Sequence, residues 1–279
     1  MMYMPILIKR GNMNTFFCIM MFIMGAFFGS FFTLAVYRLP LKKDITHERS
    51  FCPNCNHRLE AWDLIPILSY ISLGGKCRYC EEKIKIRYLL LEVLSGIVFV
   101  LAYLSYNMEY PLLEFFKTIN LIAFIFMYII LAIIAGIDKE KVIIQKNVLM
   151  VGFCINLIYN TYLYYGLELQ NVFEYNINII LSIIILIVYS SYLHIISKND
   201  EKNNLDNEKS NTRYILDIIM ILLYVFLNTN FKILIGVIIG LVVFTIIGKL
   251  LKKEKIPMAF IICIFTVVLN LIYNVSIYF

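Results

Sequence analysis

Eight long apolar runs constrain the fold of this chain more than any other feature of its sequence. A helix needs about 20 mostly apolar residues to cross a bilayer, and it satisfies its own backbone hydrogen bonds where lipid offers none. The runs therefore predict an all-α integral membrane protein with about eight transmembrane helices. They cover residues 15–37, 88–106, 116–137, 147–164, 176–196, 213–229, 231–250 and 256–278.

Composition supports the membrane class and makes the lipid bilayer the expected surroundings. Hydrophobic residues make up 61% of the chain and charged residues 16%, whereas soluble domains average about 45–50% and about 25%. No small-residue cleavage site follows the first run, so we interpret it as a retained helix. Only Asn228, Thr229 and Asn230 separate the sixth and seventh runs. A re-entrant pair is the alternative to two full crossings there.

The basic residues follow a pattern that predicts orientation. The segment 38–87 and the loops 138–147, 197–213 and 249–255 hold 21 of the 25 Lys and Arg residues. Positively charged loops stay in the cytosol, so these segments are expected inside and both termini outside. This pattern accounts for the net charge of +6. No aromatic pattern indicates stacking on bases, so no nucleic-acid partner is expected.

Two CxxC pairs with 21 residues between them predict a metal site in the segment 38–87. The pairs are Cys52 with Cys55 and Cys77 with Cys80. Two such turns offer four thiolates in the tetrahedral arrangement that zinc accepts, and a closed four-cysteine site is structural. Disulfides are rare in the cytosol, which favours a metal over cross-linking. The alternatives are two redox or unmetallated pairs, or His57 as a competing ligand.

Three acids within the predicted spans are candidate functional residues, because ionisable groups in a membrane are costly. Asp138 ends the third span, which runs inward, and Asp217 lies near the start of the sixth, which runs outward. Both are therefore expected at the cytosolic face at a similar depth. Glu92 is expected to pair with a nearby basic group such as Arg87, and a role in positioning substrate is the alternative.

A pair of aspartates at one depth can share a proton and so act as one acid and one base. Such a dyad can activate water against a peptide bond and protonate the carbonyl oxygen or the leaving amine. The competing interpretation of Asp138 is a solvated helix end beside Lys139 and Lys141. The competing interpretation of Asp217 is an ion pair with Arg213, four residues before it on a helix.

Several segments together resemble the type IV prepilin leader peptidase family. They combine a GSF…RLP pattern, a long cysteine-containing block, a GID segment and a late IPFGP-like segment. The matching segments are residues 29–31 (GSF), 37–40 (YRLP), 62–70 (WDLIPILSY), 75–80 (GKCRYC), 86–88 (IRY) with Glu92, 136–138 (GID) and 256–260 (IPMAF).

The resemblance implies a membrane endopeptidase that removes the basic leader of prepilin-like proteins at the cytosolic membrane face. Many members then methylate the new N-terminus with S-adenosylmethionine. Residues 1–110 would hold the first two spans and the cysteine loop (38–87), and residues 111–279 the aspartic peptidase region. Asp138 and Asp217 would be the catalytic aspartates. The expected location is the bacterial inner membrane, crossed several times.

The second aspartate motif departs from the family's pattern. That motif reads GxGD followed by Lys, whereas residues 214–218 read YILDI, which keeps the aspartate and lacks both glycines and the lysine. Asp200 and Asp206 fit the helix register less well. Residues 144–145 also read Ile-Gln where the family has Ile-Pro. An inactive relative that binds prepilins as a scaffold is therefore the alternative function. A transporter would also use intramembrane acids, but it does not explain the cysteine block.

Overall fold

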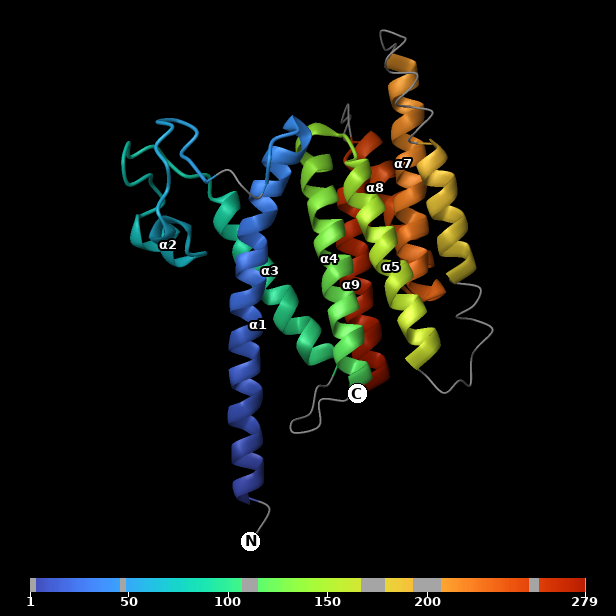
Figure 1. The fold of residues 1–279 in the computed structure, drawn as a ribbon, viewed down its shortest axis with the longest axis horizontal. Helices are drawn as coiled ribbons and strands as arrows, with labels where there is room; N and C mark the ends of the chain where they lie inside the picture. Colours follow the sequence, from blue (N-terminus) through green and yellow to red (C-terminus); the bar gives the residue numbers. More distant parts are fainter. Residues whose placement is uncertain are drawn as a thin grey trace. The chain divides into compact units, whose positions relative to one another are not determined.

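The computed structural model describes residues 4–45, 49–106, 115–166, 179–192, 207–250 and 256–278, and these ranges are built of helices and loops (Figure 1). They contain two isolated β-bridges and no strand. A further helix covers Ile179–Tyr192. The labelled helices are α1 (Met4–Arg38), α2 (Leu68–Ser72), α3 (Arg87–Ser105), α4 (Phe115–Lys141), α5 (Lys146–Gly166), α7 (Asn207–Asn228), α8 (Phe231–Leu250) and α9 (Met258–Tyr278), with the 3-10 helices η1 (Leu39–Leu41) and η2 (Ala61–Leu64).

The all-α membrane class is confirmed, and the count of eight spans is not. Within the described ranges, five helices are long and apolar enough to cross a membrane. α5 and α7 fall outside this group, and the described part of the helix Ile179–Tyr192 is shorter. The first turns of α7 read NEKSNTR, which lowers its apolar content. The break expected at residues 228–230 is present, because α7 ends at Asn228 and α8 begins at Phe231.

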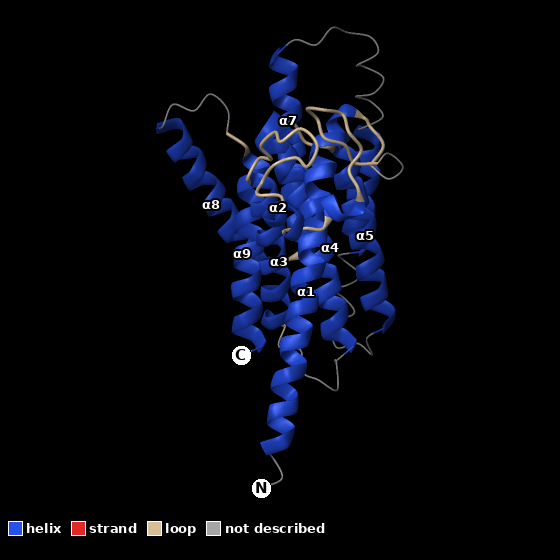
Figure 2. Cartoon of the chain, turned by 90° about the vertical axis from the view of Figure 1, so that its left-hand side faces the viewer, coloured by secondary structure: helices blue, strands red, loops and turns tan. Residues whose placement is uncertain are grey.

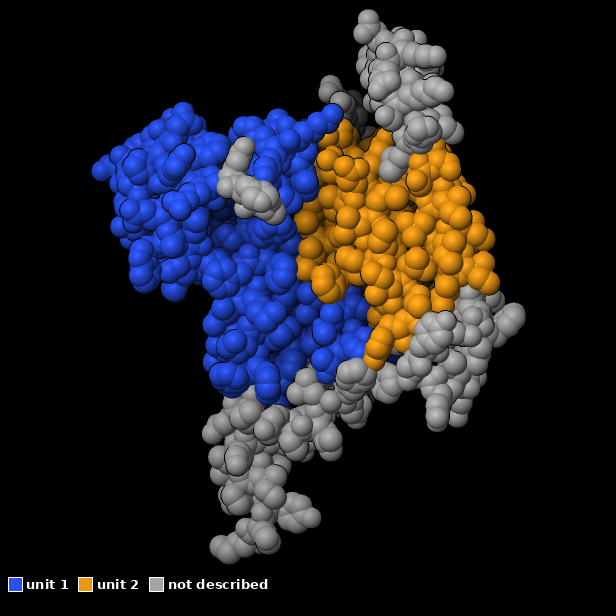
Figure 3. All heavy atoms as spheres, in the orientation of Figure 1, with its two compact units in different colours: residues 1–125, 274–279 blue, residues 126–273 orange. Residues whose placement is uncertain are grey.

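The chain divides into two compact units (Figure 3). One comprises residues 1–125 and 274–279, and the other residues 126–273. The first unit therefore holds the cysteine loop between α1 and α3. The second holds both aspartates singled out from the sequence.

In the first unit, α1 and α3 pack closely because glycines remove the side chains between them. A Cβ on Gly29 would lie 2.7 Å from the Cα of Glu92, and one on Gly25 would lie 2.5 Å from the carbonyl oxygen of Ser95. The rings of Phe28 and Phe99 stack beside this contact, with centroids 5.5 Å apart. The GxxxG spacing thus forms a helix-packing face, as expected for such a motif in membrane helices. Loops and turns gather in the segment that joins the two helices (Figure 2).

In the second unit, a buried polar network ties three helices together. Asn156 on α5 donates to the Asn228 side chain on α7 at 3.0 Å. Its own oxygen accepts from Asn160 at 3.0 Å and from Ser182, on the helix Ile179–Tyr192, at 3.1 Å. Buried side-chain hydrogen bonds of this kind hold membrane helices in register. The network therefore ties these three helices together at the end of α7, about 16 Å along that helix from Asp217.

Candidate functional site

The four cysteines predicted as metal ligands come together in the first unit. Their sulfur atoms all lie within 4.8 Å of one another, and the Sγ atoms of Cys52 and Cys80 are 3.9 Å apart. Zinc–sulfur bonds of about 2.3 Å in a tetrahedron place sulfurs about 3.8 Å apart. The arrangement therefore fits a metal ion held by Cys52, Cys55, Cys77 and Cys80.

Each CxxC pair sits on the same kind of turn. The residues that follow the pairs, Asn56 and Glu81, both have φ in the left-handed region, at 56° and 57°. The Asn56 amide donates to the Cys52 carbonyl at 2.9 Å, and the Glu81 amide donates to the Cys77 carbonyl at 3.0 Å. The two halves of the site are thus built alike, and each directs two thiols to one point.

The thiols of the site differ in acidity. The hydrogen bond from the Glu82 amide, helped by the Asn54 side chain, lowers the pKa of Cys80 to about 7. At Cys55 the His57 amide acts in the same direction, but desolvation and the neighbouring thiols outweigh it and raise the pKa to about 11. Two thiolates at this distance repel each other, so ionisation of one cysteine favours the protonated thiol at its neighbour. A cation would relieve this repulsion by binding all four as thiolates.

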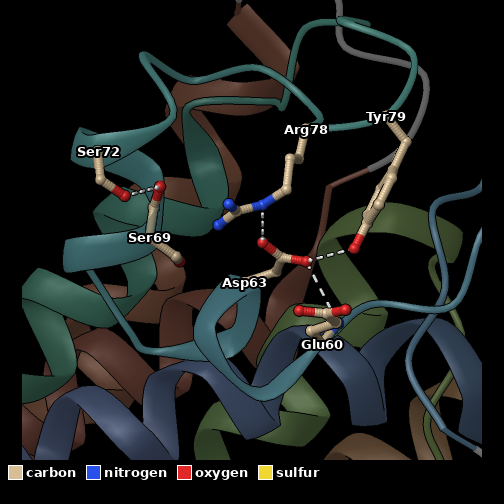
Figure 4. Close-up of polar contacts among 6 residues, drawn as sticks. All are labelled: Glu60, Asp63, Ser69, Ser72, Arg78 and Tyr79. Carbon is tan, nitrogen blue, oxygen red and sulfur yellow. Dashed lines mark hydrogen bonds and ion pairs between the residues drawn. The ribbon is translucent and has the colours of Figure 1, made fainter.

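A carboxylate braces the cysteine loop (Figure 4). Asp63 accepts from Arg78 at 2.7 Å, from the Tyr79 hydroxyl at 3.3 Å and from the Glu60 amide at 3.2 Å. Partial burial raises the pKa of Asp63, but the hydrogen bonds and the charge of Arg78 outweigh it and hold the pKa below its usual value. The His57 ring stacks on Tyr79 with centroids 3.6 Å apart. His57 therefore serves packing, and the sulfur cluster does not include it.

Glu92 joins the loop to the spanning helices. Its Oε2 accepts from the Ile67 amide at 2.7 Å, and its carboxylate also accepts a hydrogen bond from Ser30. The sequence suggested a basic partner such as Arg87, and the bonds found for this carboxylate come from a main-chain amide and a hydroxyl. A single buried acid thus pins the loop, α1 and α3 at one point.

Asp138 is fully buried, so the interpretation as a solvated helix end was wrong. Its Oδ1 accepts from the Tyr214 hydroxyl on α7 at 2.7 Å. Its Oδ2 accepts from the amides of Ala259 and Phe260, in the first turn of α9, at 2.9 and 3.3 Å. The amides at the start of a helix have no partners within it, and an anion near that end is stabilised by the helix dipole. Asp138 therefore caps α9 from another helix.

Tyr214 completes this arrangement by accepting as well as donating. The Met258 amide donates to its hydroxyl at 3.1 Å. Pro257 stands immediately before α9, a position that marks helix starts, so the sequence offered a signal for amides at this point. It offered none for Tyr214, because a tyrosine in an apolar run has no distinguishing pattern.

Asp217 is 4% exposed and lies three residues after Tyr214 on α7. Residues three apart share a helix face, with a rise of about 4.5 Å between them. Its Oδ1 is buried without a hydrogen-bond partner in the described part of the chain, as are the hydroxyls of Tyr189 and Tyr192. Lys146 and Arg213 contribute positive charge at Asp217. Asp200 and Asp206 lie outside the described residues.

Comparison with known proteins identifies what the first unit resembles. Residues 23–106 match the family model described as Bacterial Peptidase A24 N-terminal domain. This stretch contains the cysteine loop, Glu92 and all of α3. This match and the names of the relatives support a place for the chain in the type IV prepilin peptidase family. Three curated relatives, from Myxococcus xanthus, Vibrio cholerae and Bacillus subtilis, are each called "Prepilin leader peptidase/N-methyltransferase".

The relatives match this chain in part. The protein from Myxococcus xanthus (strain DK1622) is 33% identical over 112 residues, 40% of this chain and 33% of the relative. The protein from Vibrio cholerae serotype O1 is 30% identical over 155 residues, 53% and 58% of the two chains. The one from Bacillus subtilis (strain 168) is 32% identical over 130 residues, 47% and 49%. The chain thus spans between a third and three fifths of these relatives. No solved structure matches it.

Proposed function

We propose that this chain is an aspartic endopeptidase of the membrane that cleaves the basic leader from prepilin-like proteins at the cytosolic face. The observation that supports the proposal is that both aspartates are buried and that one tyrosine on α7 relates them. Asp138 is held by Tyr214, and Asp217 lies one helical turn from that tyrosine. Buried carboxylates inside an apolar helical protein are costly to retain, so they indicate function.

The proposed reaction uses the two carboxylates as a pair that holds one proton. The ionised member takes a proton from water, and the water oxygen bonds to the carbonyl carbon of the scissile peptide. The protonated member donates to the carbonyl oxygen, and the amine then leaves with a proton as the C–N bond breaks. The protons belong to the pair, so neither residue is assigned a fixed role. Tyr214 is a positioning residue, because its hydroxyl bonds to a carboxylate oxygen of Asp138.

The four cysteines are proposed to hold zinc, which would serve as a cross-link. A closed shell of four sulfurs leaves no position for water or substrate, so this metal would supply no catalytic step. It would instead hold together a loop too short to build an apolar core. Methylation of the new N-terminus is proposed from the names of the relatives, and S-adenosylmethionine as the methyl donor from the family resemblance. Both termini are proposed to lie outside, as the charge pattern predicts.

A cleavage assay tests the peptidase proposal. Membranes that carry wild type, Asp138→Asn or Asp217→Asn are incubated with a prepilin-like protein from the same source, and the shortened product is quantified. Both variants should lose cleavage at unchanged protein level. Glu140→Gln is the matched control, because Glu140 is an exposed acid two residues from Asp138, and it should retain cleavage. Full cleavage by Asp217→Asn would remove that residue from the mechanism.

A catalytically inactive scaffold that binds prepilin-like proteins is the second candidate. The observation that favours it is Tyr214 itself, whose side chain fills space beside Asp138 where the resembled motif has glycine. The same assay separates the two. Binding of a verified substrate by wild type without any cleavage would support the scaffold.

A further inference from the structure

The cysteine loop exposes apolar side chains on a segment that is otherwise polar. Trp62 on η2 is 73% exposed, and Leu68 and Ile71 on α2 are 64% and 65% exposed. Leu68 and Ile71 are three apart on a helix and so share one face. Ser69 follows Leu68 about 100° around the helix. The exposed face of the short helix therefore carries Leu68 and Ile71.

A strained turn fixes where this helix begins. The Leu68 amide donates to the Pro66 carbonyl at 2.6 Å across Ile67, which has φ 64° and ψ −52°. This is a γ-turn of the rare, strained kind, and β-branched residues seldom adopt positive φ. The bond from the Ile67 amide to Glu92 holds the turn in place. Strain of this kind persists only where the surroundings over-determine it.

The bond to Glu92 also sets the depth of α2 along α3. Glu92 is the sixth residue of α3, about 7–8 Å along the helix from its first residue. α3 is a candidate span from Arg87 onward, and its side chains at this level include the exposed Leu90 and Leu94. α2 thus lies beside the first turns of the spanning helix, as Figures 1 and 2 also show.

Basic side chains stand where the loop meets α3. Lys83 and Lys85 are exposed just before that helix, and Arg87 is its first residue. Lysine and arginine near a span end bury their stems in apolar surroundings and place their charge at lipid headgroups. The loop thus presents apolar side chains at the level where α3 enters the membrane, with basic side chains beside them. Acyl chains would accept the first group, and acidic lipid headgroups would attract the second.

We propose that η2 and α2 dock in the acidic phospholipid leaflet from which α3 begins. Leu68 and Ile71 enter the boundary between headgroups and acyl chains, and Trp62 lies at the same interface, where tryptophan is favoured. The leaflet then holds the cysteine loop against the membrane. This inference does not depend on peptidase activity, so its test can fail while cleavage stands.

The test uses the full chain and its single tryptophan, Trp62. The protein is reconstituted into phosphatidylcholine vesicles with or without phosphatidylglycerol, and its emission is quenched by brominated lipid or by soluble acrylamide. The expected result is strong quenching by lipid brominated near the headgroup, weak quenching by acrylamide, and a larger difference with phosphatidylglycerol. Quenching by acrylamide alone overturns the proposal. Equal behaviour in the two lipid mixtures overturns its electrostatic part.

Two variants sharpen the result. Leu68→Ser with Ile71→Ser should reduce quenching by brominated lipid several-fold, whereas Ser69→Ala, on the side of α2 away from Ile71, should leave it unchanged. If the double variant fails to fold, quenching of the wild-type tryptophan by lipid and by acrylamide still decides the proposal. Protection of Trp62 from acrylamide by an added apolar prepilin segment, with no quenching by lipid, would make this face a protein-docking surface and overturn the proposal.

Discussion

The hydroxyl of Tyr214 donates a 2.7 Å hydrogen bond to Asp138, although 76 positions separate the two residues in the chain. The same hydroxyl accepts from the first amide of α9, whose next two amides bind the other oxygen of Asp138. Three helices thus meet at one carboxylate. Tyr214 occupies the place of a glycine in the resembled motif, so this contact is a feature of the present chain.

Substituting Tyr214 by Phe should slow cleavage. The change removes a donor to Asp138, and hydrogen bonds to charged groups contribute roughly 1.5–3 kcal/mol. We expect kcat to fall about tenfold with KM nearly unchanged, because in the proposed mechanism the lost contact positions Asp138 and does not bind substrate. Steady-state cleavage by purified protein in detergent measures both constants.

The control is Tyr162→Phe, at the far end of α5 from Lys146, which should leave both constants unchanged. Faster cleavage by Tyr214→Phe would contradict the positioning role. It would show that the tyrosine restrains Asp138, and Tyr214→Gly should then be faster still.

The two aspartates should respond oppositely when stability is measured. Asp217 buries a carboxylate oxygen without a partner in the described chain, and such burial is destabilising. Asp217→Asn should therefore raise the melting temperature by about 2–4 °C. Asp138→Asn should lower it, because an amide NH2 would face a donor and the loss of an accepted bond costs about 1–3 kcal/mol. Thermal melts in detergent test this, and equal signs would contradict it.

The sequence predicted the elements of this fold more fully than their contacts. Apolar runs located the helices because span length is a local property of the chain. The four cysteines could be grouped because the CxxC turn is local and its repetition implies a shared ligand. Each of these patterns repeats within one segment.

What the sequence could not supply are contacts between distant segments. The partner expected for Glu92 was a basic side chain, whereas the observed one is the Ile67 amide. The strained turn at Ile67 leaves its main-chain amide available for a hydrogen bond, and no pattern of residue types in the sequence predicts such an amide. Tyr214 escaped notice for a similar reason, since its role depends on where α4 and α9 bring their ends.

The brace around Asp63 should depend on pH in a defined direction. The pKa of Asp63 is lowered in the folded loop, so its contribution to stability is present above the unfolded value of about 3.9. The contribution is lost as pH falls through the lower folded value. Arg78 is about half exposed, so solvent screens the pair and the contribution is small.

Asp63→Asn should accordingly increase hydrogen exchange in the loop by the same factor at pH 7 and pH 5. The difference from wild type should close below about pH 4, where wild type also loses the carboxylate. The zinc content of both proteins is measured at each pH, and only samples with equal content are compared. A difference that persists at lower pH would mean that Asp63 acts through its shape and not its charge.

Removal of the metal should loosen the cysteine loop and leave the spanning helices intact. The loop has few buried apolar residues, so a cross-link through four sulfurs would provide much of its stability. Cys77→Ser should reduce zinc, measured by mass spectrometry of the purified protein, from about one ion per chain to a small fraction of that. Protease sites in residues 49–86 should open, while helix content by circular dichroism is retained.

Cys154→Ser is the matched control, since this cysteine is exposed on α5 and lies outside the cluster. Zinc content unchanged in Cys77→Ser would remove that residue from the ligand set, and zinc lost from both variants would point to a general loss of folding.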